Sequence, residues 1–228
     1  MIAEDYDLTD VIDMHIHTAP DIVPRKLDDI GAARAAAHRG MRAIVLKSHV
    51  TLTADRATVA QRVVPEIEVY GGLCLNSQIG GLNPAAVEAA LQMGARFISM
   101  PTKSAANQIG STGISLLDEE GTLLPNIYEV LNLIAEADAI LATGHIALTE
   151  IRAVLAAALE QKVRKCLITH VDHPLISMSL NEQVEWARKG VLLERCYLAT
   201  LLPSEGGFTI PEFAARIRRV GPEYSVIS

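Results

Sequence analysis

The sequence predicts one TIM-like (β/α)8 barrel of the α/β class over residues 1–228. Short apolar runs alternate with amphipathic segments along the whole chain. The run Ala43-Ile44-Val45-Leu46 has no polar alternation, which is typical of parallel strands covered on both faces. A doubly wound open sheet is the alternative, but no glycine-rich phosphate loop follows the first run. A barrel is therefore the expected architecture.

Eight strands and seven helices are expected in strict alternation. The strands are predicted at 11–15, 42–46, 68–75, 96–100, 139–142, 165–169, 191–196 and 224–227. Each helix begins at a residue type that is favoured at N-caps. The expected caps are Asp28, Thr53, Asn83, Asn126, Thr149, Ser179 and Thr209. The long connection 101–125 is expected to be an active-site loop.

The last expected strand ends the chain, and no eighth helix follows it. A barrel of this kind has about 250 residues and an eighth helix. We therefore expect the barrel to be truncated, or to be completed by a partner chain. Because an incomplete barrel exposes an apolar seam, a homo-oligomer is also expected.

The composition argues against several classes of partner. The formal net charge is −7 and there is no basic cluster, so no nucleic-acid partner is expected. No apolar run reaches the roughly 18–20 residues of a membrane span, and the N-terminus does not resemble a signal peptide. The 3 cysteines are far apart, which indicates reduced thiols and a cytoplasmic protein. A small-molecule substrate is expected.

Histidines gather at the predicted strand ends. His15 and His17 alternate on the first strand, so they face one side at a spacing of roughly 6.5 Å. Two imidazoles at that spacing can bind one metal ion. His49, His145 and His170 also lie at or just after strand ends, where barrels place their chemistry. The pattern predicts a metal site at the barrel mouth.

Basic residues occur near the same mouth. Lys47 ends an apolar strand, so it either extends to solvent at the barrel rim or binds an anionic part of the substrate. Arg25 and Lys103 lie in loops on the same face. Together they would make the mouth cationic.

Two carboxylates have alternative interpretations. Glu194 lies within the apolar seventh strand, where it either pairs with Arg195 or faces the site. At the site it would serve as an acid or base, or as a partner of an imidazole. Asp13 is expected one layer below His15, where it would orient a ligand or support strand packing.

The segment Asp13-Met14-His15-Ile16-His17, followed by Gly144-His145 and Thr169-His170, resembles the amidohydrolase superfamily of metal-dependent hydrolases. It is most similar to an uncharacterised branch of that superfamily. Matching segments also occur at 20–21, 25–29, 45–49, 80–84 and 100–102. The resemblance covers essentially the whole chain, and it implies a TIM barrel and a hydrolase.

The resemblance also implies roles for single residues. It assigns His15, His17 and His145 as metal ligands, and His170 as a catalytic residue or, in members with two metals, a further ligand. Met100 stands where the two-metal type has its bridging lysine, so one divalent ion, most simply Zn²⁺, is expected, with a second ion left open.

In the implied reaction, metal-activated water attacks a C–N, C–O or P–O centre of a small anionic substrate. His170 and Glu194 are the expected catalytic residues. Decarboxylation by the same residues is a variant. The substrate would be held by Lys47, His49, Arg25 and Lys103.

One departure leaves other functions open. The superfamily has a metal-binding aspartate after strand eight, and the sequence ends just before that position. Glu194 is the candidate substitute. One rival is a metallophosphoesterase of the polymerase-and-histidinol-phosphatase type, which shares the opening motif. It expects a glutamate in strand three, where this chain has Cys74-Leu75-Asn76. The other rival is a catalytically inactive barrel.

Overall fold

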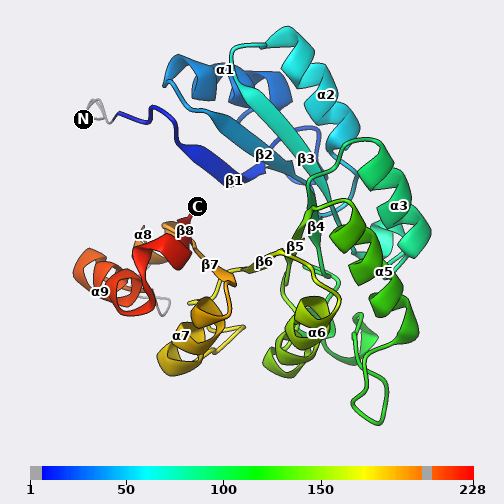
Figure 1. Cartoon of the computed structure of the whole chain (residues 1–228). Helices are drawn as coiled ribbons and strands as arrows, with labels where there is room; N and C mark the ends of the chain where they lie inside the picture. The colour runs from blue at the N-terminus through cyan, green and yellow to red at the C-terminus, as the bar shows by residue number, and fades with distance from the viewer. Residues whose placement is uncertain (1–6, 202–206) are drawn as a thin grey trace.

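The computed structural model describes residues 7–201 and 207–228. Within these residues, 8 parallel strands lie side by side in chain order and curve into a nearly closed barrel, which confirms the predicted class (Figure 1). No backbone pairing between the described residues joins the last strand to the first. The strands are β1 (Ile12–His17), β2 (Ala43–Lys47), β3 (Glu68–Cys74), β4 (Phe97–Ser99), β5 (Ile140–Ala142), β6 (Lys165–Ile168), β7 (Leu192–Arg195) and β8 (Ser225–Ile227).

Helices cover the outer face of the barrel (Figure 1). No helix in the described part of the chain is long and apolar enough to cross a membrane. The seven helices that the sequence predicts are α1 (Asp29–His38), α2 (Ala54–Val63), α3 (Pro84–Gln92), α5 (Pro125–Glu136), α6 (Leu148–Glu160), α7 (Leu180–Arg188) and α9 (Ile210–Val220). The predicted loop 101–125 also contains α4 (Ala106–Ile109) and the 3-10 turn η2 (Gly110–Thr112), and α8 (Leu198–Leu201) follows β7. Two further 3-10 turns are η1 (Ser77–Ile79) and η4 (Pro222–Tyr224).

Four of the predicted N-caps are confirmed. The side chains of Asp28, Asn83, Ser179 and Thr209 each accept hydrogen bonds from backbone N–H groups in the first turn. These bonds satisfy donors that have no partner within the helix. The boundaries of these helices were therefore readable from local chemistry.

Two predicted N-caps are wrong, because Asn126 and Thr149 lie inside helices that begin one residue earlier. Thr53 is the N-cap residue of α2 as predicted, but its side chain makes no capping bond. Its buried hydroxyl instead donates to the Leu46 carbonyl oxygen at 2.8 Å and accepts a hydrogen bond from the Gly72 N–H, also at 2.8 Å.

The barrel interior has an apolar layer with a polar layer above it. Val45, Phe97, Ala142 and Leu167 fill the apolar layer, and partly buried residues of the other strands pack against them. Because alternate residues of a strand share a face, the next interior position towards the barrel mouth is Lys47 on β2. By the same rule Glu194 follows the interior residue Leu192 on β7. Charged side chains therefore lie directly beneath the mouth.

The first strand is irregular. Asp13 pairs with Ile44 and Ile16 pairs with Leu46, so the register shifts by one residue between them. Within this irregularity, Asp13 Oδ1 accepts a hydrogen bond from the backbone N–H of His15 at 2.9 Å. Asp13 thus supports the strand backbone through this contact, which is the packing role, rather than orienting an imidazole.

Candidate active site at the barrel mouth

Five imidazoles form a closed ring of neighbours at the C-terminal ends of the strands. Their centroids are 5.1 Å apart for His15 and His17, 4.9 Å for His15 and His170, and 5.3 Å for His145 and His170. His49 closes the ring at 4.4 Å from His17 and 6.2 Å from His145. The structure therefore brings together the histidines that the sequence places at strand ends. We refer to these residues as the histidine ring.

His15 and His17 have the geometry of a chelating pair. Their Nε2 atoms are 3.2 Å apart. Two ligands with zinc–nitrogen bonds of 2.0–2.1 Å in a tetrahedral arrangement lie about 3.3–3.4 Å apart. The pair thus fits one metal ion at Nε2, as the sequence predicts.

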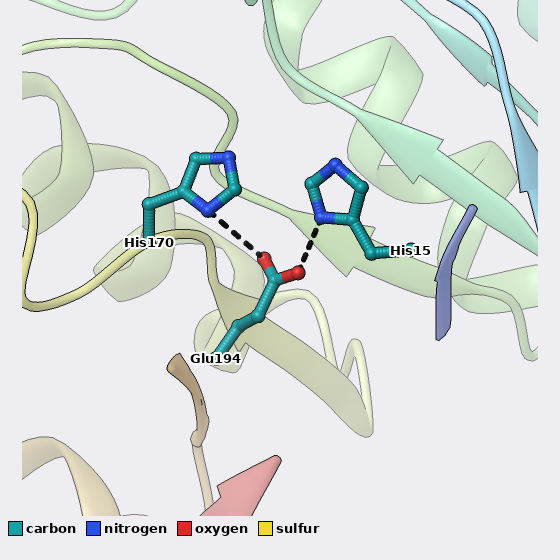
Figure 2. Close-up of side chains that lie close together, drawn as sticks. All are labelled: His15, His170 and Glu194. Carbon is teal, nitrogen blue, oxygen red and sulfur yellow. Dashed lines mark hydrogen bonds and ion pairs between the residues drawn. The ribbon is translucent and has the colours of Figure 1, made fainter. Parts of the chain in front are cut away.

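Glu194 lies beneath the ring, between two of its members (Figure 2). Its side chain is 1% exposed, and Oε1 forms a hydrogen bond with His15 Nδ1. The other oxygen, Oε2, is 3.9 Å from His170 Nδ1, which is beyond hydrogen-bond distance. Both imidazoles therefore direct Nδ1 downwards, towards the carboxylate. Donor atoms of these three residues lie within 4.8 Å of one another, so this cluster could also hold an ion.

Lys47 does not extend to solvent at the rim, because it is 2% exposed. Its Nζ lies 3.3 Å from His15 Nδ1 and 4.9 Å from the centre of the Phe97 ring, inside the barrel. Burial alone would raise the pKa of Glu194, but the hydrogen bond with His15 and the charge of Lys47 hold that pKa well below its usual range. A lysine and an ionised carboxylate therefore form the floor of the site.

Arg195 pairs with another residue, so the alternative that it pairs with Glu194 is wrong. The Arg195 guanidinium is fully buried and binds Asp172, which also accepts a hydrogen bond from Arg216 at 3.1 Å. Neighbouring residues on a strand face opposite sides. Glu194 consequently faces the barrel interior, while Arg195 faces the outer layer.

Loop residues that the sequence analysis did not assign hold two other histidines. Gln108 Oε1 lies 2.5 Å from His145 Nδ1, and Thr102 Oγ1 lies 2.8 Å from His49 Nδ1. Thr102 is itself fixed by the buried Asn76, whose amide donates to Thr102 Oγ1 at 2.7 Å. Gln108 and Thr102 come from the predicted loop 101–125. That loop was the available signal, but its length does not reveal which side chains meet an imidazole.

Backbone geometry also positions His145 and His170. Gly144 has a φ of +62°, and a Cβ there would lie 2.4 Å from the Met100 carbonyl oxygen. Glycine is therefore required directly before His145. His170 has a φ of +51°, a conformation that costs roughly 1–3 kcal/mol for a residue other than glycine and is frequent at functional sites.

Four imidazoles of the histidine ring, His17, His49, His145 and His170, are uncharged at neutral pH. Burial, followed by the positive charges around them, lowers the pKa of His17 to about 2, of His49 to about 3 and of His145 to about 4. Burial also lowers the pKa of His170 to about 3, with the Glu194 carboxylate opposing that shift. Neutral imidazoles keep a lone pair, which a metal ion requires.

Arg25 and Lys103 exert their charge on two adjacent members of the ring. Arg25 lowers the pKa of His17, and Lys103 lowers that of His49. Arg25 is also paired with Asp21, with Nη2 2.7 Å from Oδ2. Lys103 is exposed and places a positive charge on this side of the mouth, whereas the charge of Arg25 is balanced by Asp21.

The opposite side of the ring opens into a cavity of about 400 Å³. His145 and His170 lie at its inner end. Its walls come from the loop between β6 and α7 and from α8. This size is within the range of small-molecule pockets.

The chain can be assigned to a protein family. The model of a family of unknown function, DUF6282, matches residues 10–194. The chain belongs to this family. Membership of this family does not assign an activity to the chain. No curated protein matches it.

Solved structures similar to this DUF6282 protein are barrels with several activities. An amidohydrolase from Pseudomonas aeruginosa has a TM-score of 0.62 at 14% identity over 96% of this chain and 73% of that chain. A structure assigned as a deoxyribose-phosphate aldolase from Coccidioides immitis has a TM-score of 0.53 at 13% identity, over 99% and 83% of the two chains. The probable dipeptidase PvdM from Pseudomonas aeruginosa has a TM-score of 0.50 at 10% identity, over 81% and 59%. At such identities these likenesses establish the barrel fold and no activity.

Proposed function

We propose that this DUF6282 protein is a metal-dependent hydrolase of the amidohydrolase type. His15, His17 and His145 would hold one divalent ion, most simply Zn²⁺. The Nε2 atoms of His15 and His17, 3.2 Å apart, carry this proposal. A bound ion of this kind polarises a substrate oxygen and acidifies water.

The hydrogen-bond partner of each Nδ1 supports these assignments. A carboxylate oxygen is an acceptor, so His15 donates Nδ1–H to Glu194 and keeps the lone pair on Nε2. The amide oxygen of Gln108 likewise accepts from His145 Nδ1–H at 2.5 Å. Both imidazoles therefore present an unprotonated Nε2, which is the atom that binds metal.

In His170 the proton is expected on the other ring nitrogen. Its Nδ1 lies 2.7 Å from Cys196 Sγ, and burial raises the pKa of that thiol to about 11. The thiol is therefore protonated, and we assign it as the donor to Nδ1. A neutral His170 then carries its proton on Nε2, where it can donate to an oxygen that becomes negative in the reaction. This arrangement favours a catalytic role for His170 over a role as ligand.

Glu194 is better suited to positioning than to proton transfer. Its pKa is lowered, and a carboxylate of low basicity accepts a proton from water poorly. Its contact with His15 instead fixes the tautomer and orientation of a ligand, as carboxylates behind zinc-binding histidines do. Lys47 balances the charge of Glu194 from inside the barrel, and Asp21 balances that of Arg25, so Lys103 is the better candidate to hold an anionic substrate.

The test is to dialyse the protein against zinc, cobalt and manganese, and to measure bound metal. The loaded protein is then assayed with amides, carboxylic esters, phosphate esters and carboxylates that can lose CO₂. We expect one ion per chain and turnover of a C–N or C–O substrate. Turnover of phosphate esters alone would favour the phosphoesterase alternative. Metal content that is unchanged in His15→Ala would reject the proposal.

A further inference from the structure

The cavity beside the histidine ring differs in character from the rest of the mouth. Three of its lining residues, Pro174, Leu175 and Ile176, come from the loop between β6 and α7. Leu198 and Ala199 on α8 line the other wall. The walls are therefore largely apolar, and the open end of one wall exposes 59% of Leu198.

The acidic lining residue of the cavity is neutralised. The Asp172 side chain is 4% exposed, and both of its oxygens are engaged. Oδ2 binds the Arg195 guanidinium, and Oδ1 accepts from Arg216 at 3.1 Å. Asp172 thus presents little negative charge to the space, and the cavity suits an uncharged group.

The cationic side of the mouth lies across the ring from this cavity. Lys103 is exposed and directly follows Thr102, whose Oγ1 lies 2.8 Å from Nδ1 of His49, an imidazole that does not line the cavity. His145 lies between the two regions, 6.2 Å from His49 and at the inner end of the cavity. A ligand over the ring can consequently contact an apolar space at one end and positive charge at the other.

We propose that the substrate of this site is a small anion that carries an apolar group, of the size of one aromatic ring or a branched aliphatic chain. The apolar group occupies the cavity between the β6–α7 loop and α8, and the anionic group faces Lys103. This assignment names the substrate class of the proposed hydrolase and rests on that function for the reaction, but not for the binding.

Three matched probes test whether the site binds the apolar group of the substrate. The affinities of 3-phenylpropionate, propionate and the uncharged 3-phenylpropanol are measured by calorimetry with zinc-loaded and with metal-free protein. We expect 3-phenylpropionate to bind at least about tenfold more tightly than propionate, because the phenyl group leaves water for an apolar space. Equal affinities of the two acids would overturn the proposal.

Variants test where the phenyl group and the carboxylate of these probes bind. Ala199→Trp places an indole in the cavity and is expected to abolish the advantage of the phenyl probe, without changing propionate binding. Leu201→Trp adds the same ring on the same helix, outside the residues that line the cavity, and is the matched control. Lys103→Ala is expected to weaken both acids severalfold and to leave 3-phenylpropanol unchanged.

The outcomes separate this inference from the proposed function. A phenyl advantage that survives Ala199→Trp would overturn the inference even if zinc and turnover are normal. If the protein binds no zinc but keeps a phenyl advantage that Ala199→Trp removes, the hydrolase proposal fails and the pocket assignment stands. An advantage that Leu201→Trp also removes would assign the effect to α8 as a whole and reject the cavity.

Discussion

His15 on the β1 side and His170 on the β6 side of the mouth are similar in placement and opposite in chemistry. Their rings are stacked, with centroids 4.9 Å apart and planes 25° apart, and both direct Nδ1 downwards (Figure 2). His15 meets a carboxylate there, whereas His170 meets a thiol at 2.7 Å. A carboxylate only accepts, whereas a protonated thiol can donate, so we expect opposite tautomers in the two rings. The proposed function accordingly gives the two neighbouring imidazoles different roles.

The comparison shows that position at a strand end does not determine what a histidine does. The partner of the second ring nitrogen decides whether Nε2 offers a lone pair or a proton. The β1 side is thus suited to holding an ion, and the β6 side to donating a hydrogen bond. Substitutions on the two sides of the mouth test this difference.

The largest effect is expected from removing imidazoles on the two sides. His17→Ala should lower zinc affinity by more than about 100-fold, because it removes one member of the chelating pair. His170→Ala should retain one zinc ion per chain and lose turnover. Metal content after dialysis, measured together with kcat, distinguishes the two variants, and His38→Ala on α1 is the control. Loss of zinc from His170→Ala would break the comparison and favour the cluster with Glu194.

The sequence allowed the meeting of these histidines to be predicted, because barrel geometry gathers strand ends. It also placed Lys47 correctly at the end of β2 but left its direction open. The direction follows from the layers: Lys47 lies two residues after Val45, an interior residue. That assignment requires knowing which face of β2 is interior, and an entirely apolar strand does not reveal it.

The partners of the imidazoles could not be predicted for a different reason. Gln108 and Thr102 reach the ring from a loop whose path depends on the buried Asn76, which accepts from the backbone N–H of Thr102 at 2.8 Å. Such contacts join residues distant in sequence and follow no period. Thr53 shows the same limit, since its hydroxyl binds strand backbone instead of capping α2.

A smaller effect is expected from substituting Glu194, the carboxylate beneath His15. Glu194→Gln should weaken zinc binding about 10–100-fold, the usual consequence of changing the group behind a metal-binding histidine. It should also lower the free energy of unfolding by about 1–3 kcal/mol, because Lys47 remains buried without the carboxylate charge near it. Urea unfolding and zinc titration measure the two effects. Adding Lys47→Met should restore stability but not zinc affinity, and recovery of both would contradict the positioning role.

The next effect concerns pH. The pKa of His170 is about 3, whereas a histidine in an unfolded chain has a pKa of about 6.5. Between these values the unfolded state binds a proton that the folded state does not, so stability falls as the pH is lowered below about 6.5. The slope is about 1.4 kcal/mol per pH unit for each such histidine. Urea unfolding of the metal-free protein at pH 7, 6 and 5 should give a shallower slope for His170→Gln than for wild type, and identical slopes would contradict the lowered pKa.

The smallest effect, and the most direct test of the two tautomers, is expected at Cys196. Cys196→Ala removes the donor beneath His170 and should lower kcat about tenfold, while KM and zinc content stay unchanged. Cys196→Ser keeps a donor and should restore most of the rate. In ¹⁵N spectra of metal-free protein, wild type should show His170 protonated on Nε2, and Cys196→Ala should show a larger fraction protonated on Nδ1, because Glu194 Oε2 is then the nearest acceptor, at 3.9 Å. If wild-type His170 already carries its proton on Nδ1, the two sides of the mouth do not differ, and His170 belongs among the metal ligands.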